Sequence, residues 1–297
     1  MALIYNATFD KNTRKLSFED RAGNEIYSFT VPERGPGSVD DITKPLTLKA
    51  TQDGSTVTLK KSNSSLYDTF QTSRDGGNTW TDYTLDTAIT LNTGDEVSFR
   101  ARYDRTSAQL DRYFYFYFQM TGKIEAWHNV MSMWRTNDFA TYNYVESYAF
   151  YHLFEGCTSL VKAPALPATT IASYCYNGMF SGCQSLTKAP ALPATTLAYN
   201  CYNSMFSGCQ SLTKAPALPA TTLADYCYGG MFKMCQSLKE VRISATKDAS
   251  FALVHWLEGV SATGDFYCDP NATIFQTGDS GIPRNWRRLN INDYPTT

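Results

Sequence analysis

Residues 183–208 read CQSLTKAPALPATTLAYNCYNSMFSG, and the chain repeats this run before and after it. Residues 157–182 match it with only six differences in 26 positions. Self-similarity at a fixed period predicts that neighbouring units stack on one another. Seven of the eight cysteines share this spacing and form two columns: Cys157, Cys183, Cys209 and Cys235, then Cys175, Cys201 and Cys227.

Apolar columns run through the same units. A unit of this size cannot bury its own apolar face, so the columns predict one core shared between neighbours. Pro164 and Pro167 exclude a regular helix at their positions and favour extended backbone at a corner. The Cys-Tyr-Asn-x-Met-Phe-Ser-Gly segment predicts a short helical turn that ends at Gly182 or Gly208. The columns are Leu160/Leu186/Leu212/Leu238, Leu166/Leu192/Leu218, Ile171/Leu197/Leu223 and Phe154/Phe180/Phe206/Phe232.

The runs Met-Phe-Ser-Gly-Cys-Gln-Ser-Leu and Leu-Pro-Ala-Thr-Thr-Leu-Ala resemble BspA-type leucine-rich repeats. Such repeats occur in surface proteins of gut Bacteroidetes and in the phages that infect them. The resemblance covers about residues 140–297, and the 26-residue period lies within the range of about 20–29 for leucine-rich repeats. The resemblance implies an extracellular-type β-solenoid used for adhesion or recognition, and it brings no catalytic residues.

The region before the repeats reads as short strands. Residues 56–60 and 95–102 alternate between apolar and polar side chains, with turns between them. The run Tyr113–Phe118 places three phenylalanines on one face and three tyrosines on the other. We expect a β-sandwich with phenylalanine in its core; a carbohydrate platform built from the six aromatic residues is the alternative. This stretch also resembles the β-sandwich module that often precedes such repeats.

The run Ser73-Arg-Asp-Gly-Gly-Asn-Thr-Trp80 matches the Asp-box pattern of sialidases. That motif is a hairpin turn in which Asp and Gly form the bend and Trp plugs the core. A sialidase propeller carries several copies, so one copy predicts a turn and not a glycosidase.

Residues 1–31 contain three more strand candidates, within residues 3–9, 15–18 and 25–31. Residues 32–38 follow as a Pro/Gly-rich linker. Three short strands are marginal alone, so we expect this unit to dock on a partner. Tyr5, Phe9 and Phe29 are the candidate docking contacts, because aromatic residues are favoured at interface centres. The alternative is an extra sheet of the sandwich.

The predicted fold is mainly β: a small N-terminal β unit with its linker (1–37), an Ig-like β-sandwich (38–134), and a short leucine-rich-repeat solenoid with a C-terminal cap (135–297). Residues 251–257 are predicted to form a helix of the cap and residues 264–268 a strand. The cap shields the apolar face of the last repeat.

Three roles are open for the cysteines. Disulfides such as Cys175–Cys183 fit the spacing, but Ala149 replaces the partner of Cys157 in the first half-unit. Zinc would need close ligand pairs with histidines nearby, and the sequence has neither. We therefore expect reduced, buried thiols.

The lysine column Lys162, Lys188 and Lys214 is the main charged feature of the repeats. Like charges on stacked units repel unless they are solvated or countered. A solvated face that blocks edge aggregation is one interpretation. A contact with an anionic glycan is the other, and the candidate ligand face adds the tyrosine column Tyr176, Tyr202 and Tyr228.

Motifs of catalysis are missing from the sequence: no His-Glu-x-x-His, Gly-x-Ser-x-Gly, phosphate loop or dinucleotide fingerprint occurs. We therefore expect no enzyme, no cofactor and no bound metal. The net charge of −2 gives no indication of a nucleic-acid partner. No apolar run approaches the roughly 20 residues that span a membrane.

The expected function is surface-displayed binding. A bacteriophage virion component is the first hypothesis: a fibre, capsid decoration or receptor-binding protein on the virion surface. Its partners would be other virion proteins or itself, through the N-terminal unit, and a host-surface glycan or protein. The missing basic and apolar segments of a secretory signal at Met1 favour it. A Bacteroidetes adhesin on the bacterial cell surface is the alternative, and an accessory module of an enzyme is a third.

Overall fold

The computed structural model describes residues 6–10, 15–19, 25–30, 40–65, 69–106, 108, 110–249, 251–278 and 280–294. The chain divides into two compact units, Met1–Val39 and Asp40–Thr297. Within the described ranges the fold is mainly β, with several sheets and almost no helix. Short 3-10 turns occur at η2 (Val130–Met133) and η3 (Ile291–Asp293).

The first unit contains an antiparallel sheet in the order β1-β2-β3. Its strands are β1 (Asn6–Asp10), β2 (Lys15–Glu19) and β3 (Glu25–Thr30), so the three strands predicted here are confirmed. Phe9 pairs with Leu16, which pairs with Phe29, so two of the candidate docking residues share one row across the sheet. Tyr5, the third, lies outside the described residues.

The second unit begins with two sheets that pack face to face. Phe116 and Phe118 of one sheet are buried against Phe70 and Phe99 of the other, with ring centroids 5.1 Å apart in both pairs. The predicted alternation therefore holds, although the strand begins at Phe116 and not at Tyr113. One sheet has the order β10-β5-β8 and the other β13-β11-β4-β9-β6-β7. Their strands are β4 (Thr47–Ala50), β5 (Ser55–Lys61), β6 (Phe70–Ser73), β7 (Thr81–Tyr83), β8 (Ile89–Leu91), β9 (Glu96–Ala101), β10 (Phe116–Thr121), β11 (Ile124–Trp127) and β13 (Leu160–Lys162).

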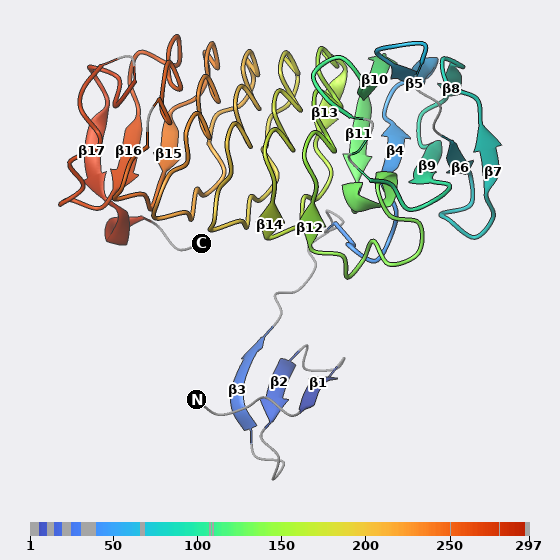
Figure 1. The fold of residues 1–297 in the computed structure, drawn as a ribbon, viewed down its shortest axis with the longest axis horizontal. Coiled ribbons are helices and arrows are strands. Elements are labelled where there is room, and N and C mark those ends of the chain that lie inside the picture. The colour runs from blue at the N-terminus through green and yellow to red at the C-terminus, as the bar shows by residue number, and fades with distance from the viewer. Residues whose placement is uncertain are drawn as a thin grey trace. The chain divides into compact units, whose positions relative to one another are not determined.

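The core of this two-sheet region runs without a break into the repeats. Strand β11 pairs in parallel with β13, the first strand of the 157–182 unit. The ring of Phe118 stacks on Phe154 at 5.2 Å, which begins the phenylalanine column of the repeats. The ribbon shows the repeats as a row of coils that starts beside β11 and ends at β17 (Figure 1).

Successive coils are bonded to one another through their backbones on one side, which we call the turn side. There the amide groups alternate in direction. Tyr176 N–H donates to Cys201 O of the next unit (3.0 Å), Met179 N–H donates back to Tyr176 O (3.2 Å), and Phe180 N–H donates to Met205 O (2.9 Å). Half of these N–H groups close local turns, and the other half bond to the neighbouring coil. The coils therefore stack along the turn side without an α-helix or a regular strand.

This pattern corrects two predictions. The Cys-Tyr-Asn-x-Met-Phe-Ser-Gly segment is not a helical turn, and residues 251–257 are not a helix. Instead, every fourth residue adopts a left-handed φ between 54° and 74°, which no α-helix tolerates. The left-handed positions are Tyr148/His152/Gly156, Tyr174/Gly178/Gly182, Asn200/Ser204/Gly208, Tyr226/Gly230/Met234 and Phe251/His255/Gly259.

The apolar columns lie inside the coils as predicted. The four leucines that begin with Leu160 and the four phenylalanines that begin with Phe154 are 0% exposed. Consecutive phenylalanine rings stack within 8° of parallel, 5.5–5.7 Å apart. Leu197 is the exception, because it is only half-buried.

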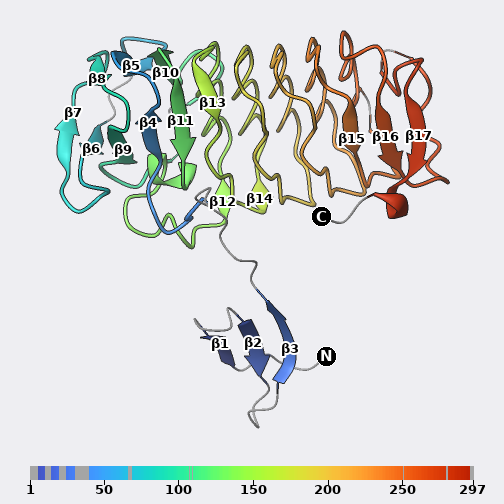
Figure 2. The ribbon, with the colours of Figure 1, turned by 180° about the vertical axis from the view of Figure 1, so that it is seen from behind.

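Short strands mark the corners and the end of the row (Figure 2). β12 (Tyr144–Val145) pairs with β14 (Thr170–Ile171). The last sheet contains β15 (Glu240–Arg242), β16 (Asp265–Cys268) and β17 (Arg287–Asn290), all parallel. The strand predicted at residues 264–268 is therefore confirmed.

Candidate functional site

The side of each repeat that carries the Lys-Ala-Pro-Ala-Leu-Pro segment, which we call the proline side, differs from the turn side. Proline has no N–H to donate to a neighbouring strand. Between the units that begin at Cys183 and Cys209, the described residues show one backbone bond on this side, from Ser211 N–H to Gln184 O (3.2 Å). These two units are therefore joined along the turn side and separate along the proline side.

The structure divides the lysine column. Lys162 is half-buried: its ammonium lies 2.7 Å from Asp40 and 3.6 Å from the ring centre of Trp127, and burial lowers its pKa. Lys188 and Lys214 are exposed and line one cavity together. Lys188 and Lys214 are thus brought together, while Lys162 lies at the junction with the two-sheet region.

The tyrosine column cannot form a ligand face. Tyr176, Tyr202 and Tyr228 are each 1% exposed, and their rings stack in the core. Burial raises their pKa values well above the ordinary range. The prediction that these tyrosines belong to a ligand face is therefore wrong: each lies between two residues with left-handed φ, and its ring points inward.

A different set of aromatic side chains lies on the surface. Seven rings form an unbroken chain of contacts, which we call the aromatic ridge. Consecutive centroids are 4.7–5.9 Å apart. The ridge consists, in order, of Tyr115, Tyr151, Tyr148, Tyr174, Tyr199, Tyr226 and Phe251.

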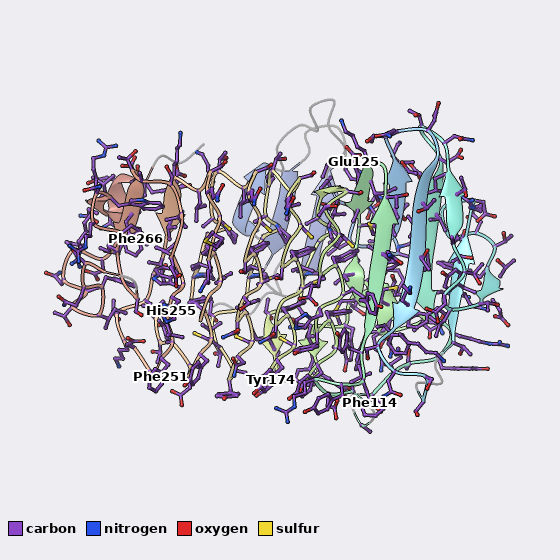
Figure 3. The ribbon with its side chains drawn as sticks, turned by 90° about the horizontal axis from the view of Figure 1, so that it is seen from above. Phe114, Glu125, Tyr174, Phe251, His255 and Phe266 are labelled. Atoms are coloured by element: carbon purple, nitrogen blue, oxygen red, sulfur yellow. The ribbon has the colours of Figure 1, made fainter. Side chains whose placement is uncertain are left out.

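The left-handed turns create this ridge. Tyr148, Tyr174, Tyr226 and Phe251 all occupy the first left-handed position of their units, which turns each side chain outward in register. Asn200 breaks the column, and Tyr199 beside it fills the gap with a ring turned 73° from Tyr174. Figure 3 shows Tyr174 and Phe251 along one edge of the row, with Glu125 at the opposite edge. Comparing positions 26 residues apart does not reveal this surface, because Tyr199 lies one residue out of register.

The ridge is partly exposed, and its rings carry no charge at neutral pH. Phe251 is 62% and Tyr199 43% exposed, and the other five rings are half-buried. Burial is the main cause that raises the pKa of Tyr174, to about 12, and it also raises the pKa values of Tyr148 and Tyr151. These hydroxyls stay protonated at neutral pH and can donate hydrogen bonds to a ligand.

The cysteines are structural. All eight are free and buried. In one column thiols donate to phenylalanine carbonyls 29 residues earlier, as in Cys183 Sγ to Phe154 O (3.1 Å) and Cys209 Sγ to Phe180 O (3.2 Å). Burial raises the pKa of Cys157 to about 12, which keeps the thiol unreactive near neutral pH.

The Asp-box segment forms the β6–β7 hairpin turn, as predicted. Asp75 accepts from Ser73 Oγ (2.6 Å) and Thr79 Oγ1 (2.7 Å), and these bonds lower the pKa of its carboxyl. Trp80 does not enter the core: it is half-buried, its indole donates to Gly77 O (2.9 Å), and Arg100 lies 4.2 Å from its ring centre. The carboxylate is committed to the turn.

The three histidines lie apart in the structure. His128 accepts from Asp41 N–H (3.2 Å), and burial is the main cause that lowers its pKa. His152 pairs with Glu155, and the exposed His255 lies 2.9 Å from Glu258. Among the described residues no group of three His, Cys, Asp or Glu side chains could hold a metal ion.

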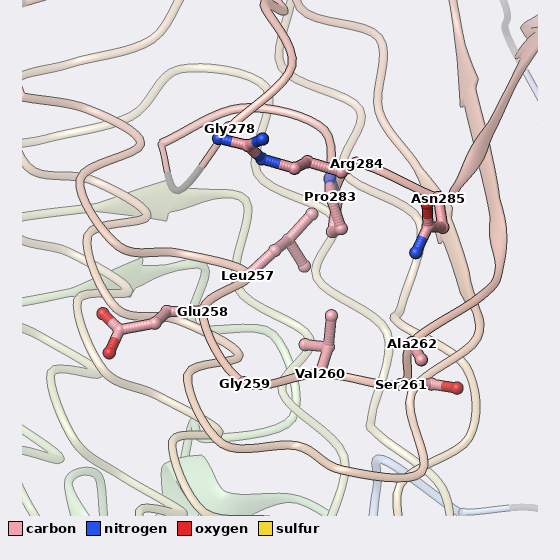
Figure 4. A pocket seen from close by; sticks show the side chains of 10 residues that line it. All are labelled: Leu257, Glu258, Gly259, Val260, Ser261, Ala262, Gly278, Pro283, Arg284 and Asn285. Atoms are coloured by element: carbon pink, nitrogen blue, oxygen red, sulfur yellow. The ribbon is translucent and has the colours of Figure 1, made fainter.

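A cavity of about 250 Å³ lies near the end of the row (Figure 4). Leu257 and Val260 point into it, and Arg284 lies at its rim. Its carboxylate, Glu258, already contacts His255 and Lys233 (3.2 Å).

Over the described residues, no helix is long and apolar enough to cross a membrane. No protein-family model, curated protein or solved structure matches this chain.

Proposed function

We propose that this chain is a non-enzymatic binding protein displayed on a surface, and that the aromatic ridge is its contact surface. The continuous chain of seven exposed or half-buried rings carries the proposal. Monomeric soluble proteins rarely expose large contiguous apolar patches unless they bind something. Tyrosine suits such a surface because its ring is rigid, amphipathic and loses little entropy on binding.

The architecture supports the same proposal. The 26-residue period and the bonds between successive coils support a leucine-rich-repeat solenoid of BspA type over residues 135–297. The two facing sheets support an Ig-like β-sandwich over residues 38–134. Stacked repeats create extended surfaces, and such surfaces are used for recognition.

For its location we propose the surface of a bacteriophage virion, as a fibre, capsid decoration or receptor-binding protein. The separate N-terminal unit would dock it there, on other virion proteins or on a second copy. A Bacteroidetes cell-surface adhesin is the alternative, and the resemblance of the repeats supports both.

The location is tested by immunogold labelling of purified phage particles and of host cells with antibodies to this chain. Label on particles supports the virion proposal, and label on uninfected cells supports the adhesin. A chain that starts at Ser38 should stay folded, since the second unit has its own core. It should no longer associate with particles if the N-terminal unit is the docking element.

The contact surface is tested by flow cytometry of the labelled full-length chain on Bacteroidetes cells. Tyr199→Ser combined with Phe251→Ser removes the two most exposed rings of the ridge, and we expect binding to fall at least about tenfold. Tyr103→Ser is the matched control, because Tyr103 is 65% exposed and lies outside the ridge. Unchanged binding of the double variant would refute the ridge as contact surface.

A further inference from the structure

The proline side of two repeats carries a second surface, built from other segments than the aromatic ridge. Two cavities adjoin there, one of about 430 Å³ and one of about 380 Å³. Both are lined by Lys188, Ala189 and Pro216, so they form one groove, which we call the proline groove. Volumes of this size match ordinary small-molecule sites.

The groove lies where two proline-containing segments face each other without strand pairing. The 183–208 and 209–234 units both read Lys-Ala-Pro-Ala-Leu-Pro, and almost no backbone bond closes the space between them. The next unit reads Lys-Glu-Val-Arg-Ile, and there pairing resumes: Ala215 N–H donates to Glu240 O (2.9 Å) and Leu218 N–H to Arg242 O (3.1 Å). The sequence change at Glu240 therefore sets one end of the groove.

The two halves of the groove differ in chemistry. Pro190, Pro193 and Pro219, together with alanines, give the larger cavity an apolar wall. The smaller cavity is the more polar of the two and is called the polar half: Thr187, Thr213, Tyr294 and the two lysines Lys188 and Lys214 line it beside Ala189, Ala215 and Pro216.

The polar half carries excess positive charge. Within the described part of the chain, Lys188 makes no ion pair. Lys214 lies 3.2 Å from Glu240, whose carboxylate also accepts from the Tyr294 hydroxyl (2.6 Å). Lys214 thus pairs with a carboxylate that also accepts from Tyr294, while the ammonium group of Lys188 is available to a second anionic group.

We infer that the proline groove binds a carboxylated oligosaccharide. A sugar acid offers a carboxylate for Lys188 and Lys214, hydroxyls for the threonines and Tyr294, and an apolar ring face for the proline and alanine wall. A chain of such sugars is long enough to occupy both halves. This site stands apart from the aromatic ridge, so either assignment can fail without the other.

The test measures binding of the full-length chain to a short oligogalacturonate and to an oligomer of sialic acid, two sources of the same chemistry, by calorimetry. We expect at least one to bind. The methyl ester of that oligomer, which has the same shape without the charge, should bind about tenfold more weakly, as should the acid at high salt.

Two variants locate the site. Lys188→Gln with Lys214→Gln should weaken binding of the acid about tenfold, and Ala189→Phe should block the groove without changing its charge. Lys233→Gln is the control: it removes a lysine of the same repeats that pairs with Glu258 outside the groove. Thermal unfolding verifies that each variant is folded.

Three results would overturn the inference: neither acid binds, acid and ester bind equally, or both groove variants bind like the parent chain.

Discussion

The turn side and the proline side of the repeats come from the same 26 residues, yet they are opposite in physical character. On the turn side, amide groups bond to the next coil at every second residue, and the side chains beneath are buried. On the proline side the backbone is nearly unpaired between the central units, and small cavities lie open. One side therefore supplies cohesion, and the other is free to carry a groove.

A short repeat can thus combine stability with an open surface. Each coil needs bonds to its neighbours along only one side, because the apolar columns bury the remaining interface. Proline on the other side costs little there, since no ladder forms that it could break.

We expect the largest effect from alkaline pH, which should destabilise the packing of the turn side. The pKa of Cys157 is raised by burial from 9.0 to about 12, and those of Cys175 and Tyr176 are raised well above their ordinary values. The native state keeps these protons while the unfolded state loses them, so their stabilising contribution is complete below pH 9.0 and is lost as the pH rises toward 12. We expect melting temperatures, measured with reductant, to fall steeply above pH 9.0. A flat profile up to about pH 10.5 would contradict thiol burial.

Phe206→Ala should have the next largest effect. The ring is 0% exposed and stacks between Phe180 (5.6 Å) and Phe232 (5.7 Å). Truncating a buried phenylalanine costs about 3–5 kcal/mol, measured by urea unfolding. Phe251→Ala is the control on the surface, and its cost should stay below about 1 kcal/mol. Equal losses of unfolding free energy in the two variants would show that the buried phenylalanine column contributes no more to stability than the aromatic ridge.

Gly178→Ala tests the left-handed turns themselves. At φ +60° a Cβ strains the backbone, and here it would also lie 2.8 Å from the His152 ring. We expect a loss of about 2 kcal/mol in the free energy of unfolding, partly restored by His152→Ala. Gly182→Ala has a similar φ of +74° with no atom nearer than 3.5 Å, so it should cost only about 1 kcal/mol.

Pro190→Ala should have the smallest effect, because its segment pairs with no neighbouring strand. We expect the free energy of unfolding to change by less than about 1 kcal/mol, mainly through the greater entropy of the unfolded chain. A loss above about 2 kcal/mol would mean that the proline side also holds the coils together.

Much of the fold could be predicted from the sequence. The three N-terminal strands, the alternation of Phe116 and Phe118, and the leucine and phenylalanine columns all follow from periodicity. Two helical segments were predicted wrongly, since Gly182 resembles a helix stop, whereas it is one of a series of left-handed residues spaced four apart.

Less of the candidate site could be predicted. Lys188 and Lys214 were named and do line one cavity, but Lys162 is held by Asp40, which is 122 residues away in the sequence. Tyr176 and its column were assigned to the surface, and they are core. The aromatic ridge was missed because Tyr199 and Tyr115 join it only through space.

The 26-residue period is enough to predict units stacked around shared columns of leucine, phenylalanine and cysteine. It can do so because apolar residues that recur at a fixed period can align in columns when the units stack. Which tyrosines face inward and where the coils separate become clear from the folded chain alone. Those outcomes depend on the sign of φ at every fourth residue and on backbone bonds between units, and neither is encoded in hydrophobic periodicity.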